Sequence, residues 1–110
     1  MINPFARGIK DRDKVEIIYQ QAYSQIIKPY QKYLSQLIDS GVRNEVLLNA
    51  ITPIWNQQSK IYYELVQERR EMDRRETSRR KRLEVKIAAQ VRVLEKLNDP
   101  SIIKLNLENN

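Results

Sequence analysis

The stretch from Thr52 to Asn98 constrains the fold most, because apolar residues recur there at helical spacing on both sides of a highly charged middle. Residues 69–82 read RREMDRRETSRRKR. Their eight basic and three acidic side chains give a net charge of +5, against +6 for the whole chain. The stripe passes through Ile54, Ile61, Leu65, Met72, Leu83, Ile87 and Leu94. The pattern predicts one long helix over 53–98 whose middle cannot be buried in a dry core.

Composition favours an all-α protein and excludes most catalytic chemistry. The 110 residues suit one domain, and they include only two glycines and four prolines. Cysteine and histidine are absent, which excludes disulfides, thiolate nucleophiles, Cys/His zinc sites and imidazole bases. The closest acidic cluster, Asp11, Asp13 and Glu16, is interpreted as a helix cap with dipole complements. We therefore expect no enzyme activity, no metal, no cofactor and no small-molecule substrate.

The location expected from the sequence is the cytoplasm, without membrane contact. No apolar run is long enough for a transmembrane helix, and the first residues have no apolar core typical of a signal peptide.

The first half of the chain predicts an irregular arm over residues 1–10 and a helix over 12–39. Pro29 lies inside that helix, but the apolar stripe keeps its phase across it, so we expect a kink and no break. Gly41 is expected to end the helix in the left-handed conformation.

The second half begins with a predicted short helix over 44–51. Thr52 and Pro53 then either start the long helix, as N-cap and first residue, or only kink a helix that began at Asn44. Asn98-Asp99-Pro100 ends the long helix, and residues 99–110 form a tail whose apolar residues either dock on a helix pair or form a short strand.

Two architectures are open for this single domain. A helix over 53–98 would be roughly 65–70 Å long against about 40 Å for the helix over 12–39, so it would outrun its partner in an antiparallel hairpin. A break near Thr77-Ser78 would instead give a three-helix bundle. We favour the continuous helix, because Glu71–Arg75 and Glu76–Arg80 have attractive (i, i+4) spacing. A helix starting at Ser78 would also have four cations in its first turn, against the helix dipole.

The basic segment predicts binding of a DNA or RNA backbone with low sequence specificity. Arginine forks bind phosphate oxygens in pairs, but no set of side chains suited to reading bases is present. The alternatives are a solvated helix stabilised by its interleaved acidic residues, an acidic protein partner or, least favoured because the segment has no apolar face to insert, an anionic lipid surface. The candidate nucleic-acid-binding residues are Arg69, Arg70, Arg74, Arg75, Arg79, Arg80, Lys81 and Arg82.

A second set of residues predicts a different function. Their four-three-four-three spacing is that of a short heptad seam, which would join two copies of the chain or bind a partner helix. The seam consists of Leu83, Ile87, Gln90, Leu94 and Leu97. On this alternative the protein is a helical adaptor or assembly protein that acts through coiled-coil-like contacts.

The aromatic residues are expected to form core and not a base-stacking surface. Tyr19, Tyr23, Tyr30 and Tyr33 lie on or beside the stripe of the first helix, so we expect them to pack against Trp55 and Tyr62.

Overall fold

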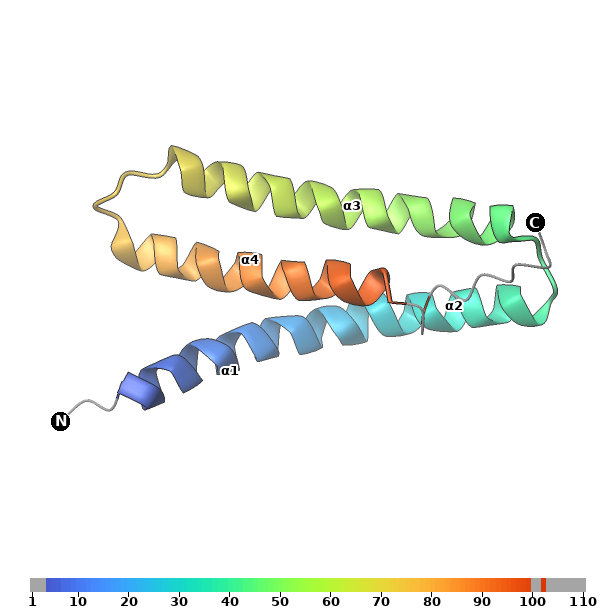
Figure 1. Cartoon of the computed structure of the whole chain (residues 1–110), viewed down its shortest axis with the longest axis horizontal. Helices are drawn as coiled ribbons and strands as arrows, with labels where there is room; N and C mark the ends of the chain where they lie inside the picture. Colours follow the sequence, from blue (N-terminus) through green and yellow to red (C-terminus); the bar gives the residue numbers. More distant parts are fainter. Residues whose placement is uncertain (1–3, 100–101, 103–110) are drawn as a thin grey trace.

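The computed structural model describes residues 4–99 and residue 102, and its fold is all-α, as predicted. Helix α1 (Pro4–Ala22) continues through the π-helix η1 (Tyr23–Ile27) into α2 (Lys28–Asp39). Helix α3 (Asn44–Glu71) runs back along this first rod, and α4 (Thr77–Leu97) turns again. Figure 1 shows α4 between α1 and α3, so the end where α3 turns into α4 is also the end where α1 begins.

The favoured prediction of one continuous helix over 53–98 is wrong, and the three-helix alternative is confirmed. Helix α3 ends at Glu71, and α4 begins at Thr77. Met72 leaves the helix in an extended conformation (φ −76°, ψ 140°) and is buried, so it anchors the turn. The Asp73 carboxylate then accepts a hydrogen bond from the Arg75 N–H at 3.0 Å, a local turn that competes with helix.

Burial explains why the chain breaks despite the local charge pattern. The (i, i+4) ion pairs of an unbroken helix would contribute only about 0.2–0.5 kcal/mol each. Folding back buries several apolar side chains of α4 against the rest of the chain, and each large one contributes on the order of 1.5–3 kcal/mol. The buried apolar residues of α4 are Leu83, Ile87, Ala89, Val93 and Leu97. Packing therefore outweighs both the ion pairs and the unfavourable cations in the first turn of α4.

The first rod is longer than the sequence predicted. Helix begins at Pro4, so residues 4–10 are not an irregular arm, and Asp11 and Asp13 lie within the helix and not at its cap. A proline is tolerated in a first helical turn because the N–H it lacks would have no partner there. From Pro4 to Asp39 the rod is about 54 Å long at the α-helical rise, which matches the 58 Å length of the molecule.

Pro29 is accommodated without a break, as predicted. The preceding turn widens into η1, where the Lys28 N–H donates to the Tyr23 carbonyl five residues back. A wider turn relieves the clash between the proline ring and the carbonyl of Gln25, and π segments commonly accompany helix distortions.

The turn from α2 to α3 depends on Gly41. Its φ of 75° is the left-handed conformation expected from the sequence, and its N–H donates to the Ile38 carbonyl at 3.0 Å. Helix α3 then runs through Pro53. Of the two alternatives for this region, the helix that begins at Asn44 and continues past Pro53 is therefore the correct one. Thr52 is not an N-cap, because its hydroxyl donates backward to the Leu48 carbonyl at 2.7 Å.

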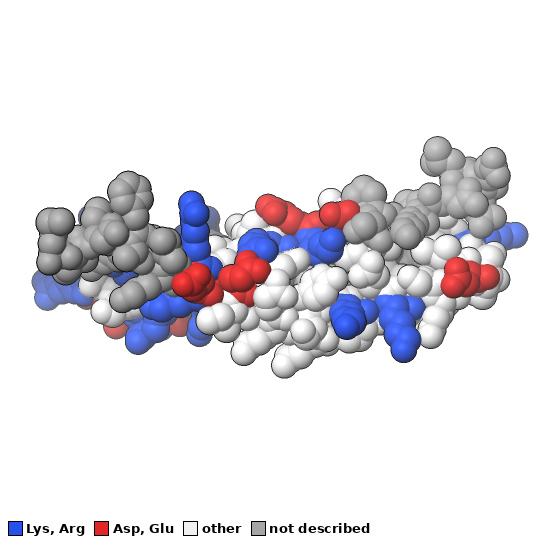
Figure 2. All heavy atoms as spheres, turned by 90° about the horizontal axis from the view of Figure 1, so that it is seen from below, with Lys and Arg blue, Asp and Glu red and all other residues white. Residues whose placement is uncertain are grey.

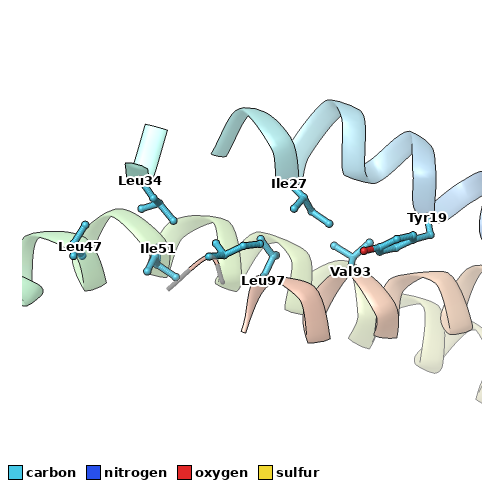
Figure 3. Packing of buried hydrophobic residues seen from close by; sticks show 8 residues of the cluster. Tyr19, Ile27, Leu34, Leu47, Ile51, Val93 and Leu97 are labelled. Carbon is cyan, nitrogen blue, oxygen red and sulfur yellow. The ribbon is translucent and has the colours of Figure 1, made fainter. Parts of the chain in front are cut away.

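The main core lies where the first rod, α3 and the end of α4 meet. Figure 3 shows labelled side chains from all three pointing toward one another. Ile102 is also buried in this cluster. The described part of the tail therefore docks on the helices, which is one of the two predicted alternatives. The buried cluster consists of Tyr19, Ile27, Leu34, Leu47, Ile51, Val93, Leu97 and Ile102.

The tyrosines follow the prediction in part. Tyr19 is buried, and Tyr23, Tyr30 and Trp55 pack around the cluster. Tyr33 differs, because 48% of it is exposed.

The predicted heptad seam is covered by the chain itself. Leu83, Ile87 and Leu97 are buried within the monomer, and Leu94 is half-buried. Gln90 Nε2 donates to the backbone carbonyl and the side-chain Oε1 of Gln58 on α3, at 2.8 and 2.9 Å. Gln58 is only 3% exposed, so this amide pair is a polar contact inside the α3–α4 interface. An adaptor function would therefore need a surface other than this seam.

The amide pair gives a prediction for stability. Gln90→Leu leaves the buried Gln58 Oε1 without its donor, so we expect it to lower the free energy of unfolding by about 1–3 kcal/mol. Gln58→Leu/Gln90→Leu replaces both partners by apolar groups of similar size and should recover much of that loss. Urea unfolding followed by circular dichroism measures both. A double variant whose loss equals the sum of the losses measured for Gln58→Leu and Gln90→Leu separately would contradict this account.

Candidate nucleic-acid interface

The break between α3 and α4 gathers the basic segment at one end of the molecule, which we call the basic tip (residues 69–82). Arg69 and Arg70 lie in the last turn of α3, and Arg74 and Arg75 lie in the connection. The remaining four, Arg79–Arg82, lie in the first turns of α4. A continuous helix would have spread these pairs over about 20 Å of its length. The turn instead brings them together around one hairpin end (Figure 1).

All eight predicted residues lie at or near the surface. Arg69 and Arg80 are half-buried, and the other six are exposed. On the face shown in Figure 2, basic and acidic side chains lie together at the end of the molecule that carries the tip, and further basic side chains follow along its length. The expectation that this segment stays out of the dry core is therefore confirmed.

Arg79 differs from the other members of the tip, because it ties the hairpin together. Its guanidinium donates to Glu68 of α3 at 2.9 Å and to Glu76 at 3.3 Å. The hydrogen bond to Glu68 and the nearby charge of Glu76 raise the pKa of Arg79. About half of each side chain is exposed, so this contact fixes geometry more than it adds stability. Glu68 lies outside the basic run, and its role follows only from the fold.

The other cations of the tip lack such compensation. Among the described residues, no carboxylate lies within ion-pair distance of Arg69, Arg70, Arg74, Arg75, Arg80, Lys81 or Arg82. The pairs Glu71–Arg75 and Glu76–Arg80 expected from the sequence do not form. Glu71 instead accepts a hydrogen bond from Gln67 at 2.9 Å, and Glu76 binds Arg79. Within the described part of the chain, seven cations of the tip therefore have no ion-pair partner, and five of them are exposed.

The start of α4 adds to this positive potential. Its first turn contains no acidic residue, and Glu76 at the N-cap makes no side-chain capping bond. The Arg80 N–H donates to the Glu76 carbonyl at 2.9 Å. The N–H groups of Thr77–Arg79 come before this bond in the helix, so they have no acceptor within α4. The positive end of the helix dipole and the tip cations therefore face the same region.

A second ion pair joins the first rod to α4 away from the tip. Arg92 of α4 donates to the carboxylate of Glu16 on α1, and its guanidinium carbon lies 4.0 Å from the centroid of the Tyr19 ring. The hydrogen bond from Arg92, assisted by one from Gln20 at 2.8 Å, lowers the pKa of Glu16. Arg92 is thereby matched by a carboxylate, unlike the seven cations of the tip.

Neither a known protein family, nor a curated protein, nor a solved structure matches this sequence. Within the described residues, none of the helices combines the length and the apolar character needed to cross a bilayer.

The Glu16–Arg92 pair gives a prediction for acid sensitivity. Because the pKa of Glu16 is lower in the folded protein than the ordinary 4.5, the ionised carboxylate stabilises the fold above that pH. The contribution is lost as the pH falls through the lowered pKa. We expect the gap in urea midpoint between wild type and Glu16→Gln to be present at about pH 6 and to narrow toward about pH 3. Arg92→Gln removes the other partner of the same pair and should give a similar profile. A gap that stays constant with pH would contradict the assignment.

Proposed function

We propose that this protein binds the phosphate backbone of nucleic acid through the basic tip, with little sequence preference. The observation that carries the proposal is the group of seven cations at one hairpin end, none of which has a described carboxylate within ion-pair distance. Arginine binds phosphate oxygens with two parallel hydrogen bonds, which makes these residue types suited to a polyphosphate chain.

The position of the cations favours the tip as the binding site, and the net charge of the whole chain would contribute little. Apart from the basic tip, the chain has a net charge of only +1, because the tip contributes +5 of the +6. At physiological salt, charges separated by more than about 8 Å are largely screened from each other. In a molecule 58 Å long, cations in the other half therefore add little to the attraction felt at the tip.

The proposal is tested by three substitutions at the tip. Arg70, Arg74 and Arg75 are exposed and have no ion-pair partner among the described residues, so Arg70→Gln/Arg74→Gln/Arg75→Gln should leave the fold intact. Removing up to three phosphate contacts should weaken binding of a labelled duplex by roughly tenfold or more near 0.1 M salt. The slope of log K against log salt should become shallower by about 2–3. Fluorescence anisotropy at several salt concentrations measures both.

The matched control is Lys28→Gln/Lys32→Gln/Arg43→Gln. These three side chains are also exposed, and they lie on α2 and the turn after it, in the half of the molecule away from the tip. The control changes the net charge by the same amount and should bind nearly as wild type does. Equal losses in the two triple variants would show that net charge, and not the tip, governs binding. An affinity independent of salt would refute backbone recognition altogether.

A further inference from the structure

A groove runs along one side of the contact between α1 and α4, next to the basic tip. It has a volume of about 580 Å³. Of the described residues that line it, five come from α4 and four from α1, so the groove exists only because α1 packs on α4. The lining residues are Asp11, Lys14, Ile17, Ile18, Ser78, Lys81, Arg82, Val85 and Lys86. We call it the α1–α4 groove.

The charge of this groove is one-sided. Among the described residues, four cations and one carboxylate line it, which gives a net charge of +3. A second hollow flanks the same helix pair and is lined by Arg12, Lys81 and Arg92 against Asp11, Glu16 and Glu84, so its net charge is zero. In that hollow Arg92 is also tied to Glu16. Of these two neighbouring surfaces, the α1–α4 groove is therefore the one that attracts an anion.

The floor of the groove is apolar, which narrows the kind of anion that fits. Ile17 is 59% exposed, and Ile18 and Val85 are half-buried. A small inorganic anion would leave these side chains in water. A ligand with negative charges beside flat, weakly hydrated groups covers both the cations and the floor. The phosphates and bases of a nucleic-acid strand have this combination.

The groove is continuous with the basic tip. Lys81 and Arg82 belong to both surfaces, and Ser78 lies in the first turn of α4. Arg82 and Lys86 are four residues apart, so they follow one face of α4 with a rise of about 6 Å. Lys14 stands on the opposite wall, on α1. A strand that leaves the tip along this face therefore meets further cations on both sides.

The usual spacing of packed helices favours a single strand in this groove. Axes of packed helices lie about 8–10 Å apart, so the furrow between two helices receives one chain and not a duplex. We propose that the α1–α4 groove binds single-stranded nucleic acid, with phosphates on Lys14, Arg82 and Lys86 and bases against Ile17 and Val85. This inference rests on the proposed function and adds a preference for single strands.

The test compares labelled oligo-dT of about 16 nucleotides with a duplex of the same length, using the full chain. Lys14→Gln/Lys86→Gln removes two groove cations that lie outside the tip. We expect it to weaken binding of the single strand by about tenfold near 0.1 M salt and to make the salt slope shallower by about 1.4. Duplex binding should change less than about twofold, since a duplex contacts the tip alone. Lys28→Gln/Lys32→Gln is the charge-matched control and should bind both ligands nearly as wild type does.

Ile17→Glu tests the floor independently. Ile17 is largely exposed, so the fold should persist, while a carboxylate in the floor should repel the strand and selectively weaken oligo-dT binding. Circular dichroism checks that the variant is folded. If it is not, the lysine pair alone decides.

The possible failures are distinguishable. If Lys14→Gln/Lys86→Gln binds oligo-dT as wild type does, or loses strand and duplex equally, the groove inference is overturned. The proposed function then still stands, provided the tip variants lose binding. If the wild type binds neither ligand at low salt, both proposals fall. If a glutamate-rich helical peptide binds with the same dependence on Lys14 and Lys86 while oligo-dT does not, the groove is a site for an acidic protein, and the inference is wrong.

Discussion

The structure depends on covering the apolar face of α4. Exposing that apolar face to water would cost free energy in proportion to its area. Helix α3 cannot cover it without a reversal of the chain between Glu71 and Thr77. Once the chain turns, α4 lies between α1 and α3 (Figure 1). Leu83, Ile87, Val93 and Leu97 of α4 are then buried. Apolar burial is proportional to area, whereas exposed ion pairs along a helix are weakened by water. The chain therefore accepts an electrostatically unfavourable start to α4.

That unfavourable start is also what makes the tip a candidate site. Cations at the positive end of a helix dipole repel one another and the dipole. Arg79 is held by Glu68 and Glu76, which fixes the two helices of the hairpin relative to each other. The remaining cations keep their charge uncompensated by the described carboxylates, so an external polyanion would relieve the repulsion. A feature that costs local stability can in this way supply binding energy, as is common at functional sites.

The same packing shapes the surface beside the tip. Because α1 and α4 run in parallel and start at the same end, Lys14 and Lys86 come to line one groove although they lie 72 positions apart in the sequence. On the other side of this helix pair, Glu16 neutralises Arg92, which leaves that surface balanced. Positive charge is therefore unevenly distributed in two directions. Along the length of the molecule it is concentrated at the tip, and across the α1–α4 pair it is concentrated in one groove.

The sequence by itself determined the helical class, the turn at Gly41, the passage of the first rod through Pro29 and the exposure of the basic run. These features follow from periodicity, glycine geometry and the cost of burying unpaired charge, all of which act within a few residues. Only the tertiary structure decided where the second half of the chain breaks and what covers Leu83, Ile87 and Leu97. It also decided that Arg79 is paired while its neighbours are not. Those outcomes depend on how much apolar area is buried between segments far apart in the chain. No local sequence pattern contains that quantity.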